Sequence, residues 1–124
     1  YFTSIINVLS LKSYMNILFI CSKNEWRSRT AETIFKQNEN HQVRSAGTSQ
    51  EARVKVNEKL IHWADLIFVM EKKHKQRLEE KFGDLLHHKN MVVLNIEDNY
   101  RYMDEELMQI LTVSVNPYLD MNEE

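Results

Sequence analysis

The sequence predicts an α/β fold, a three-layer sandwich in which helices flank a four-stranded parallel sheet. Two observations lead to this prediction. Short continuous apolar runs, such as MNILFIC at residues 15–21, have the composition of strands that are buried on both faces of a sheet. Between these runs, apolar residues recur at helical spacing, so that strands and helices alternate along the chain.

Each element is predicted from its own pattern. The apolar runs predict strands at residues 15–21, 41–46, 66–70 and 91–96. The helical periodicity predicts helices at residues 27–37, 54–63, 71–82 and 103–111, the third of which stops at Gly83. We expect one domain over residues 15–112, an extension over residues 1–14 and an irregular C-terminal tail over residues 113–124.

Composition restricts the class of protein. The 124 residues suffice for one domain with an ordinary core, because 43% of them are hydrophobic. The formal net charge of −2 argues against a broad binding surface for nucleic acid or for an anionic membrane. The apolar runs are far shorter than the ~20 residues of a membrane-spanning helix, and residues 1–14 lack the pattern of a signal peptide.

The cysteine and histidine content bears on compartment and cofactors. A single cysteine forbids an internal disulfide and favours a reducing compartment, so that a cytoplasmic protein is expected. His87 and His88 are adjacent, which is poor geometry for two ligands of one metal, and the other histidines have no spaced partners. We therefore expect no metal site.

The loop between the first strand and the first helix carries the chemistry. Cys21 ends the strand and Arg27 begins the helix, so the residues between them must curl around the helix N-terminus. Inward-facing N–H groups and the positive end of the helix dipole form a site for a dianion, to which Arg27 adds a bidentate fork. The same groups stabilise a thiolate, so we expect Cys21 to be a nucleophile and Ser28 to donate its hydroxyl to the sulfur.

Spacing alone leaves a second interpretation open. A Cys with an Arg shortly after it is common by chance. A lone Cys after an apolar strand, as Cys21 is, is also typical of a buried and inert thiol. The neighbouring residues decide between the two.

These neighbours match a known signature. In CSKNEWRSRTAE, residues 21–32, the matching positions are Cys21, Asn24, Arg27, Ser28, Thr30, Ala31 and Glu32. The motif SAGT at residues 45–48 and the run ADLIFVME at residues 64–71 are similar to further segments of the same pattern. The chain thus resembles the low molecular weight protein tyrosine phosphatases over most of residues 15–111.

The resemblance implies a function. It implies a phosphatase without metal or cofactor that hydrolyses phosphotyrosine in proteins, or small aryl phosphates, through a phosphocysteine intermediate. It implies that the loop after the first strand binds the phosphate with Ser22, Lys23, Asn24, Glu25, Trp26, Arg27 and Ser28. Within that pattern Asn24 braces the loop from inside, with Ser28 and Ser45 as further supports.

A phosphatase of this kind needs a general acid that protonates the leaving group. The family takes it from an Asp-Pro-aromatic segment after the fourth strand, where this chain has IEDNY. The match assigns Asp98 as the acid and places Tyr100 at the aromatic position. Trp26, Tyr100 and Tyr102 are candidates for the mouth of the substrate pocket, and plain packing is the alternative for all three. Asp-Asn is also ordinary turn chemistry, Glu97 is a neighbouring competitor, and Asp104 is expected to cap the last helix.

Besides Asn99, which replaces the proline of the acid segment, the chain departs from the family pattern in four places. Lys23 replaces a glycine, which costs about 1 kcal/mol or more if that position needs positive φ. Glu25 places a carboxylate in a loop meant for anions and is expected to point outward. Trp26 replaces a second cysteine, and the stretch between residues 48 and 64 is short.

Three other functions are considered. A module that binds phosphate or phosphopeptides with little or no turnover would fit these departures. The loop CSKNEWRS also resembles the loop of phosphoserine-directed phosphatases, but the additional substrate-binding elements of those enzymes are missing from this chain. A thioredoxin-linked arsenate reductase is excluded, because it needs cysteines besides Cys21.

Overall fold

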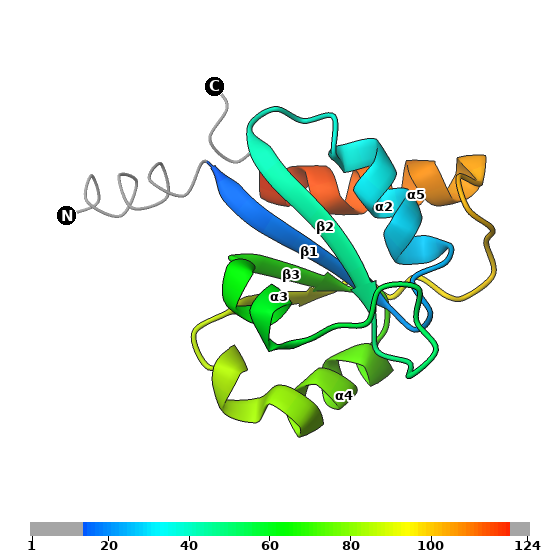
Figure 1. Ribbon diagram of the computed structural model, residues 1–124. Coiled ribbons are helices and arrows are strands. Elements are labelled where there is room, and N and C mark those ends of the chain that lie inside the picture. The colour runs from blue at the N-terminus through cyan, green and yellow to red at the C-terminus, as the bar shows by residue number, and fades with distance from the viewer. Residues whose placement is uncertain (1–13, 120–124) are drawn as a thin grey trace.

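The computed structural model describes residues 14–119 and confirms the α/β sandwich (Figure 1). Its sheet has four parallel strands in the order β2-β1-β3-β4. The strands are β1 (Met15–Cys21), β2 (His41–Gly47), β3 (Leu66–Val69) and β4 (Asn90–Val93). The helices are α2 (Arg27–Phe35), α3 (Glu58–Trp63), α4 (Lys72–Phe82) and α5 (Glu105–Leu119), with a 3₁₀ turn, η1, at Gly83–Leu86.

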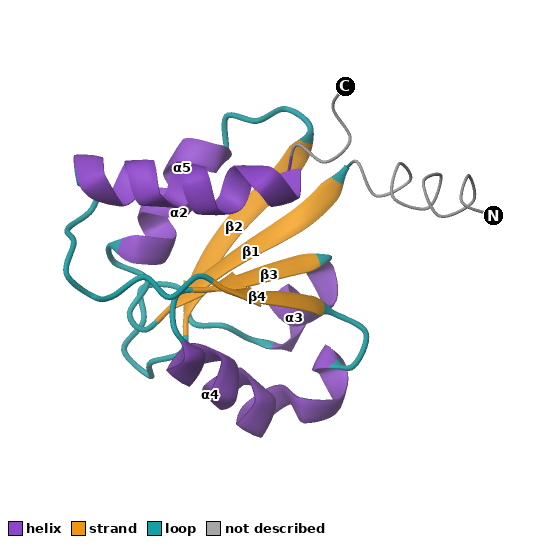
Figure 2. Cartoon of the chain, turned by 180° about the vertical axis from the view of Figure 1, so that it is seen from behind, coloured by secondary structure: helices purple, strands orange, loops and turns teal. Residues whose placement is uncertain are grey.

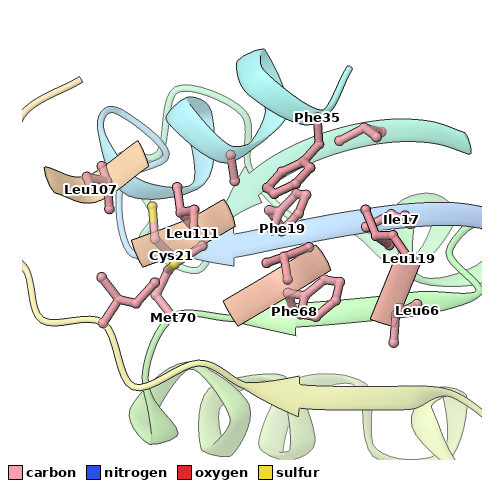
Figure 3. Close-up of a cluster of buried hydrophobic side chains, with 14 of the residues drawn as sticks. Ile17, Phe19, Cys21, Phe35, Leu66, Phe68, Met70, Leu107, Leu111 and Leu119 are labelled. Carbon is pink, nitrogen blue, oxygen red and sulfur yellow. The ribbon is translucent and has the colours of Figure 1, made fainter. Parts of the chain in front are cut away.

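Helices cover both faces of the sheet. Figure 2 shows α2 and α5 on one face and α3 and α4 on the other. Phe19 in the central strand β1 is buried with residues of α2 and α5, whereas its neighbours Leu18 and Ile20 pack with residues of α3 and α4. The ring of Phe19 stacks between those of Phe35 and Phe68, at centroid distances of 5.6 and 5.2 Å (Figure 3). The continuous apolar character of β1 follows from this two-sided burial.

The carboxyl ends of the strands form one edge of the sheet, as they must in a parallel sheet. Cys21, the last residue of β1, is the register partner of Gly47, the last residue of β2. Past the end of β3, the amide of Met70 donates to the carbonyl of Ile20, and the amide of Ile96 donates to the carbonyl of Met70. The segments after β1, β3 and β4 therefore meet at this edge, which is where open α/β sheets bind ligands.

Two predicted elements are shorter in the structure by three or more residues at one end. The helix expected at 54–63 begins only at Glu58, because Val56 still hydrogen-bonds to the carbonyl of Gly47 and Asn57 caps the helix by accepting from the amide of Leu60. The last strand ends at Val93, not at residue 96, although the chain continues alongside β3. Sequence patterns locate elements better than their ends.

The prediction of an irregular tail from residue 113 is wrong up to Leu119. Helix α5 continues through Leu119 because Val115 and Leu119 extend its buried stripe into the core. Pro117 lies inside this helix and removes only the bond to the carbonyl of Val113, a residue that is 74% exposed and open to water. Asp104 caps the helix as predicted, since its carboxylate accepts from the amides of Glu106 and Leu107.

The two ends of the chain lie outside the described residues. The predicted extension falls there except for Tyr14, as do residues 120–124 of the predicted tail. Among the helices within residues 14–119, none is long and apolar enough to cross a membrane.

Candidate active site

A cavity of about 170 Å³ opens where β1 ends and α2 begins. Its lining brings together most residues that the sequence predicted for the site, namely Cys21, Ser22, Lys23, Glu25, Trp26, Arg27 and Asp98. All but the last belong to the phosphate loop, defined here as residues 21–28. Asp98 comes from the segment after β4, so two strand ends contribute to the same cavity.

The sulfur of Cys21 lies within a set of hydrogen-bond donors. Cys21 is only 3% exposed, and its Sγ lies 2.9 Å from the Oγ of Ser28. The backbone N–H of Asn24 donates to the same sulfur at 3.3 Å. A hydroxyl, an amide and the N-terminus of α2 therefore surround the sulfur.

Asn24 supports the loop from inside. Its backbone has φ 60, whereas Lys23 is not among the residues with positive φ. The backbone strain considered for Lys23 is therefore absent. The residue with left-handed backbone is Asn24, and asparagine tolerates positive φ better than most other residue types. The Nδ2 of Asn24 donates to the Oγ of Ser28 at 2.7 Å and to the Oγ of Ser45 at 2.9 Å. Both contacts lie where the sequence predicted loop supports.

Arg27 is held by two groups from distant parts of the chain. It is 2% exposed, and its Nη1 donates to the Oε1 of Glu71 at 2.7 Å and to the carbonyl of Ile96 at 2.8 Å. Partial burial raises the pKa of Glu71, but the hydrogen bond and charge of Arg27 outweigh it and hold that pKa below its usual value. With Nη1 fixed in this way, Arg27 also lines the cavity.

Glu71 and His74 are functional candidates that the sequence analysis missed. The side chain of Glu71 accepts from the backbone N–H of His74. In return, the Nδ1 of His74 accepts from the backbone N–H of Glu71 at 3.0 Å. Because Nδ1 is an acceptor, the neutral ring carries its proton on Nε2, which donates to the Oγ of Ser22 at 2.9 Å. The hydroxyl proton of Ser22 then stays available to the cavity. A carboxylate and a histidine three positions apart at a helix start were the available signal.

The buried His74 makes stability depend on pH. Burial, followed by the positive charge of Arg27, lowers its pKa from 6.5 to about 4. The unfolded chain therefore binds more protons than the folded one between these values. The contribution of His74 is complete above pH 6.5 and declines as pH falls to about 4. We expect a loss of up to about 3 kcal/mol in the free energy of unfolding across this window, measured by urea titration at several pH values.

The matched variants for this prediction are His74→Gln and His62→Gln. Glutamine keeps an amide donor for Ser22 but does not titrate, so the His74 variant should flatten the pH dependence between 6.5 and 4. His62 is exposed, and its replacement should retain the wild-type slope. An unchanged slope in His74→Gln would contradict the assignment.

Gly47 lets the phosphate loop pack closely against β2. A Cβ at Gly47 would lie 2.3 Å from the carbonyl oxygen of Ser22 and 2.8 Å from the Cβ of Ala52. We expect Gly47→Ala to lower the free energy of unfolding by roughly 2 kcal/mol and to weaken phosphate binding, because the Ser22 peptide must move. Urea unfolding and a phosphate titration measure the two effects. In Gly83→Ala the new Cβ meets nothing within 4 Å, so stability should change by less than about 1 kcal/mol, and equal losses in both variants would rule out the clash.

Asp98 lies beside Arg27 in the lining of the cavity. Its side chain is 57% exposed, and its Oδ1 is 3.6 Å from the Nε of Arg27. Trp26, predicted at the mouth, lines the cavity and is 40% exposed. Glu25 is exposed, as expected, although its residue still lines the cavity.

The prediction that Tyr100 lies at the mouth is not supported by the structure. Tyr100 is absent from the cavity lining, its ring packs against the core beside α5, and its hydroxyl donates to Glu106 at 3.3 Å. Tyr102 also turns elsewhere, because its ring lies under the guanidinium of Arg29 and its hydroxyl contacts Thr33. Contacts with α5 hold Tyr100 away from the cavity, and contacts with α2 hold Tyr102 away from it. Of the aromatic residues predicted at the mouth, Trp26 alone lines the described cavity.

The fold and the site together define an α/β protein with a cysteine-arginine phosphate loop. Residues 16–62 match the family model described as low molecular weight phosphotyrosine protein phosphatase. This match covers less than half of the chain and includes the whole phosphate loop, so the chain is similar to that family over the segment that carries Cys21 and Arg27. No curated protein matches the sequence significantly.

Solved structures show the same fold. The tyrosine phosphatase Wzb from Escherichia coli K30, in complex with phosphate, has a TM-score of 0.70 at 20% identity, with 86% of this chain and 97% of that chain covered. Wzb from Vibrio vulnificus, in complex with benzylphosphonate, has a TM-score of 0.70 at 22% identity, with 86% and 97% covered. The YwlE arginine phosphatase from Geobacillus stearothermophilus has a TM-score of 0.65 at 18% identity, with 89% and 97% covered.

Proposed function

We propose that this protein is a cysteine-dependent phosphatase that hydrolyses phosphotyrosine in proteins, or small aryl phosphates, through a phosphocysteine intermediate. One observation carries the proposal. Cys21, Arg27 and Asp98 line one cavity of about 170 Å³. A nucleophile, an anion-binding fork and a proton donor are the groups that this reaction requires.

The first step transfers the phosphoryl group to Cys21. The thiolate attacks phosphorus while the N–H groups of the phosphate loop and Arg27 bind the equatorial oxygens. As the S–P bond forms, the P–O bond to the leaving group breaks and its electron pair goes to the leaving oxygen. Asp98, in its protonated form, supplies the proton, so that the first product leaves as a neutral phenol.

The second step returns the enzyme to its starting state. Asp98, now a carboxylate, takes a proton from a water molecule that attacks the phosphorus of the phosphocysteine. The P–S bond breaks, and its electrons return to the sulfur, where the Ser28 hydroxyl at 2.9 Å stabilises the thiolate. Inorganic phosphate is released. Because the nucleophile must remain reduced, this activity suits a reducing compartment such as the cytoplasm.

The role of Asp98 is tested with two leaving groups. Wild type and Asp98→Ala are compared on p-nitrophenyl phosphate, whose phenolate leaves without help, and on phenyl phosphate, whose leaving group needs a proton. We expect kcat to fall about 100-fold or more on phenyl phosphate and much less on p-nitrophenyl phosphate. Equal losses on the two substrates would contradict the acid role. Tight vanadate binding without turnover of either substrate by the wild type would favour the alternative of a phosphate-binding module.

Phosphoarginine is a second candidate substrate. Two acidic residues, Glu25 and Asp98, are among the residues that line the cavity, together with Trp26, and a guanidinium next to the phosphoryl group would be attracted by their negative charge and by the indole ring. The likeness to an arginine phosphatase is consistent with this chemistry. The two candidates are separated by kcat/KM on matched phosphotyrosine and phosphoarginine peptides. A preference for phosphoarginine that is lost in Glu25→Gln would select the second candidate, and a preference for phosphotyrosine that persists in that variant would select the first.

A further inference from the structure

The segment 48–53, called the strap below, fixes the outer side of the phosphate loop. It follows β2 and precedes α3, and Figure 1 shows it beside the end of β1. The backbone N–H groups of Thr48 and Ser49 donate to the carbonyls of Cys21 and Ser22 at 3.0 and 2.9 Å. The N–H of Arg53 donates to the carbonyl of Lys23 at 2.9 Å. Consecutive carbonyls of the loop are thereby held outward.

Outward carbonyls turn the amide hydrogens of the loop inward. In a trans peptide the C=O and N–H of one unit point in opposite directions. The carbonyl of Lys23 shares its peptide with the N–H of Asn24, and that N–H does point inward, to the Cys21 sulfur. The same relation directs the N–H groups of the preceding units toward the anion site. The strap therefore sets the donors of the phosphate site without contacting the phosphate itself.

The side chain of Arg53 extends this pattern by one peptide. Its Nε donates to the carbonyl of Asn24 at 3.1 Å, and that carbonyl shares a peptide with the N–H of Glu25. Asn24 has the left-handed backbone, so the peptide after it lies where the loop turns most sharply. Backbone donors of the strap hold the units before this point, whereas a guanidinium holds the unit after it.

A series of polar contacts also links Arg53 to the side chain of Asn24, on the inner side of the loop. Its Nη2 lies 4.0 Å from the Oε1 of Glu32, which accepts from the Oγ of Ser45. Ser45 in turn accepts from the Nδ2 of Asn24. The exposed ion pair is weak by itself. It nevertheless orients the guanidinium, so that the Nε faces the Asn24 carbonyl.

We propose that Arg53 is a positioning residue of the phosphate loop: its guanidinium holds the peptide between Asn24 and Glu25 with the carbonyl outward and the N–H toward the phosphate. This role rests on the proposed function, because it takes the phosphate loop as the site that binds the phosphate oxygens. This role is not predictable from the sequence, because Arg53 lies in the polar stretch EARVK. In the structure its side chain is 41% exposed. An exposed arginine on a solvated loop is the ordinary interpretation.

The test compares Arg53→Ala and Arg53→Lys with the control Lys55→Gln. Lys55 is an exposed cation close to Arg53 in sequence, and its ammonium contacts only Gln50 among the described residues. The control therefore removes a neighbouring positive charge without disturbing the loop. Three quantities are measured: the vanadate dissociation constant, the shift of the Glu25 amide resonance when inorganic phosphate is added, and the free energy of unfolding.

We expect Arg53→Ala to weaken vanadate binding about tenfold and to reduce the phosphate-induced shift of the Glu25 amide. Lys55→Gln should stay within about twofold of the wild type. Lysine keeps the charge but lacks a donor at the Nε position, so Arg53→Lys should recover only a small part of the affinity. This comparison also decides the question if the alanine variant does not fold.

Two outcomes would overturn the inference. Full recovery in Arg53→Lys would assign the effect to charge alone, and wild-type vanadate affinity in Arg53→Ala would remove the effect altogether. The vanadate and amide measurements do not require turnover. A wild-type protein that binds vanadate but hydrolyses no phosphate ester would therefore defeat the proposed function, while Arg53 would still be judged by affinity.

Discussion

Replacing Cys21 by serine is expected to abolish turnover while the protein still binds phosphate. The hydroxyl of serine is a far weaker nucleophile than a thiolate, and the Ser28 hydroxyl and the Asn24 N–H that contact the sulfur remain in the variant. We expect kcat on p-nitrophenyl phosphate to fall by a factor on the order of 10⁴ or more. Steady-state hydrolysis without added metal, with phosphate binding followed separately by calorimetry, measures the two effects.

The matched control for this prediction is Ser28→Ala. It leaves the nucleophile in place and removes a hydroxyl that contacts the sulfur at 2.9 Å and accepts from the Nδ2 of Asn24 at 2.7 Å. We expect a loss of about 10- to 100-fold in kcat, concentrated in the hydrolysis of the intermediate, so that a phosphoenzyme accumulates. Turnover that survives in Cys21→Ser would disprove the nucleophilic role, because within residues 14–119 Cys21 is the only cysteine, and its sulfur lies in the cavity.

Sequence predicts the part of the site that is local in the chain. Cys21, Asn24 and Arg27 lie within one loop, and the strand before it and the helix after it have clear periodicities. Strand, loop and helix in that order already determine a ring of N–H groups at a helix N-terminus. The contacts of Asn24 with Ser28 and Ser45 complete a loop of the kind that the sequence indicated.

The groups that hold this loop are harder to predict, since they come from distant segments. Glu71, the carbonyl of Ile96 and the strap all reach the loop across the edge of the sheet. Each is ordinary in its local sequence, because a carboxylate at a helix start and an arginine in a polar loop are common. Only the register of the strands brings them to Arg27 and Asn24. Tyr100 illustrates the converse, because the packing of α5 turns away an aromatic residue that sequence placed at the mouth.

Arg27→Lys is expected to have the second large effect, although it conserves the charge. The guanidinium of Arg27 binds Glu71 and the Ile96 carbonyl through Nη1 and leaves its other nitrogens for the phosphate. A lysine ammonium is one point of charge and cannot serve both sides at once. We expect kcat/KM on p-nitrophenyl phosphate to fall about 1000-fold or more. We also expect phosphate affinity to fall with it, in contrast to Cys21→Ser.

The control Glu71→Gln tests the contact of Arg27 with Glu71 separately from the contact of Arg27 with phosphate. It keeps an acceptor for Nη1 but removes the carboxylate charge. Arg27 therefore stays in place, but the orientation of its guanidinium is less firmly fixed. We expect a loss of about tenfold in kcat/KM and little change in the fold. If Arg27→Lys bound phosphate within about threefold of the wild type, simple charge attraction would suffice. The fixed fork that Glu71 and Ile96 impose on Arg27 would then have no part in catalysis.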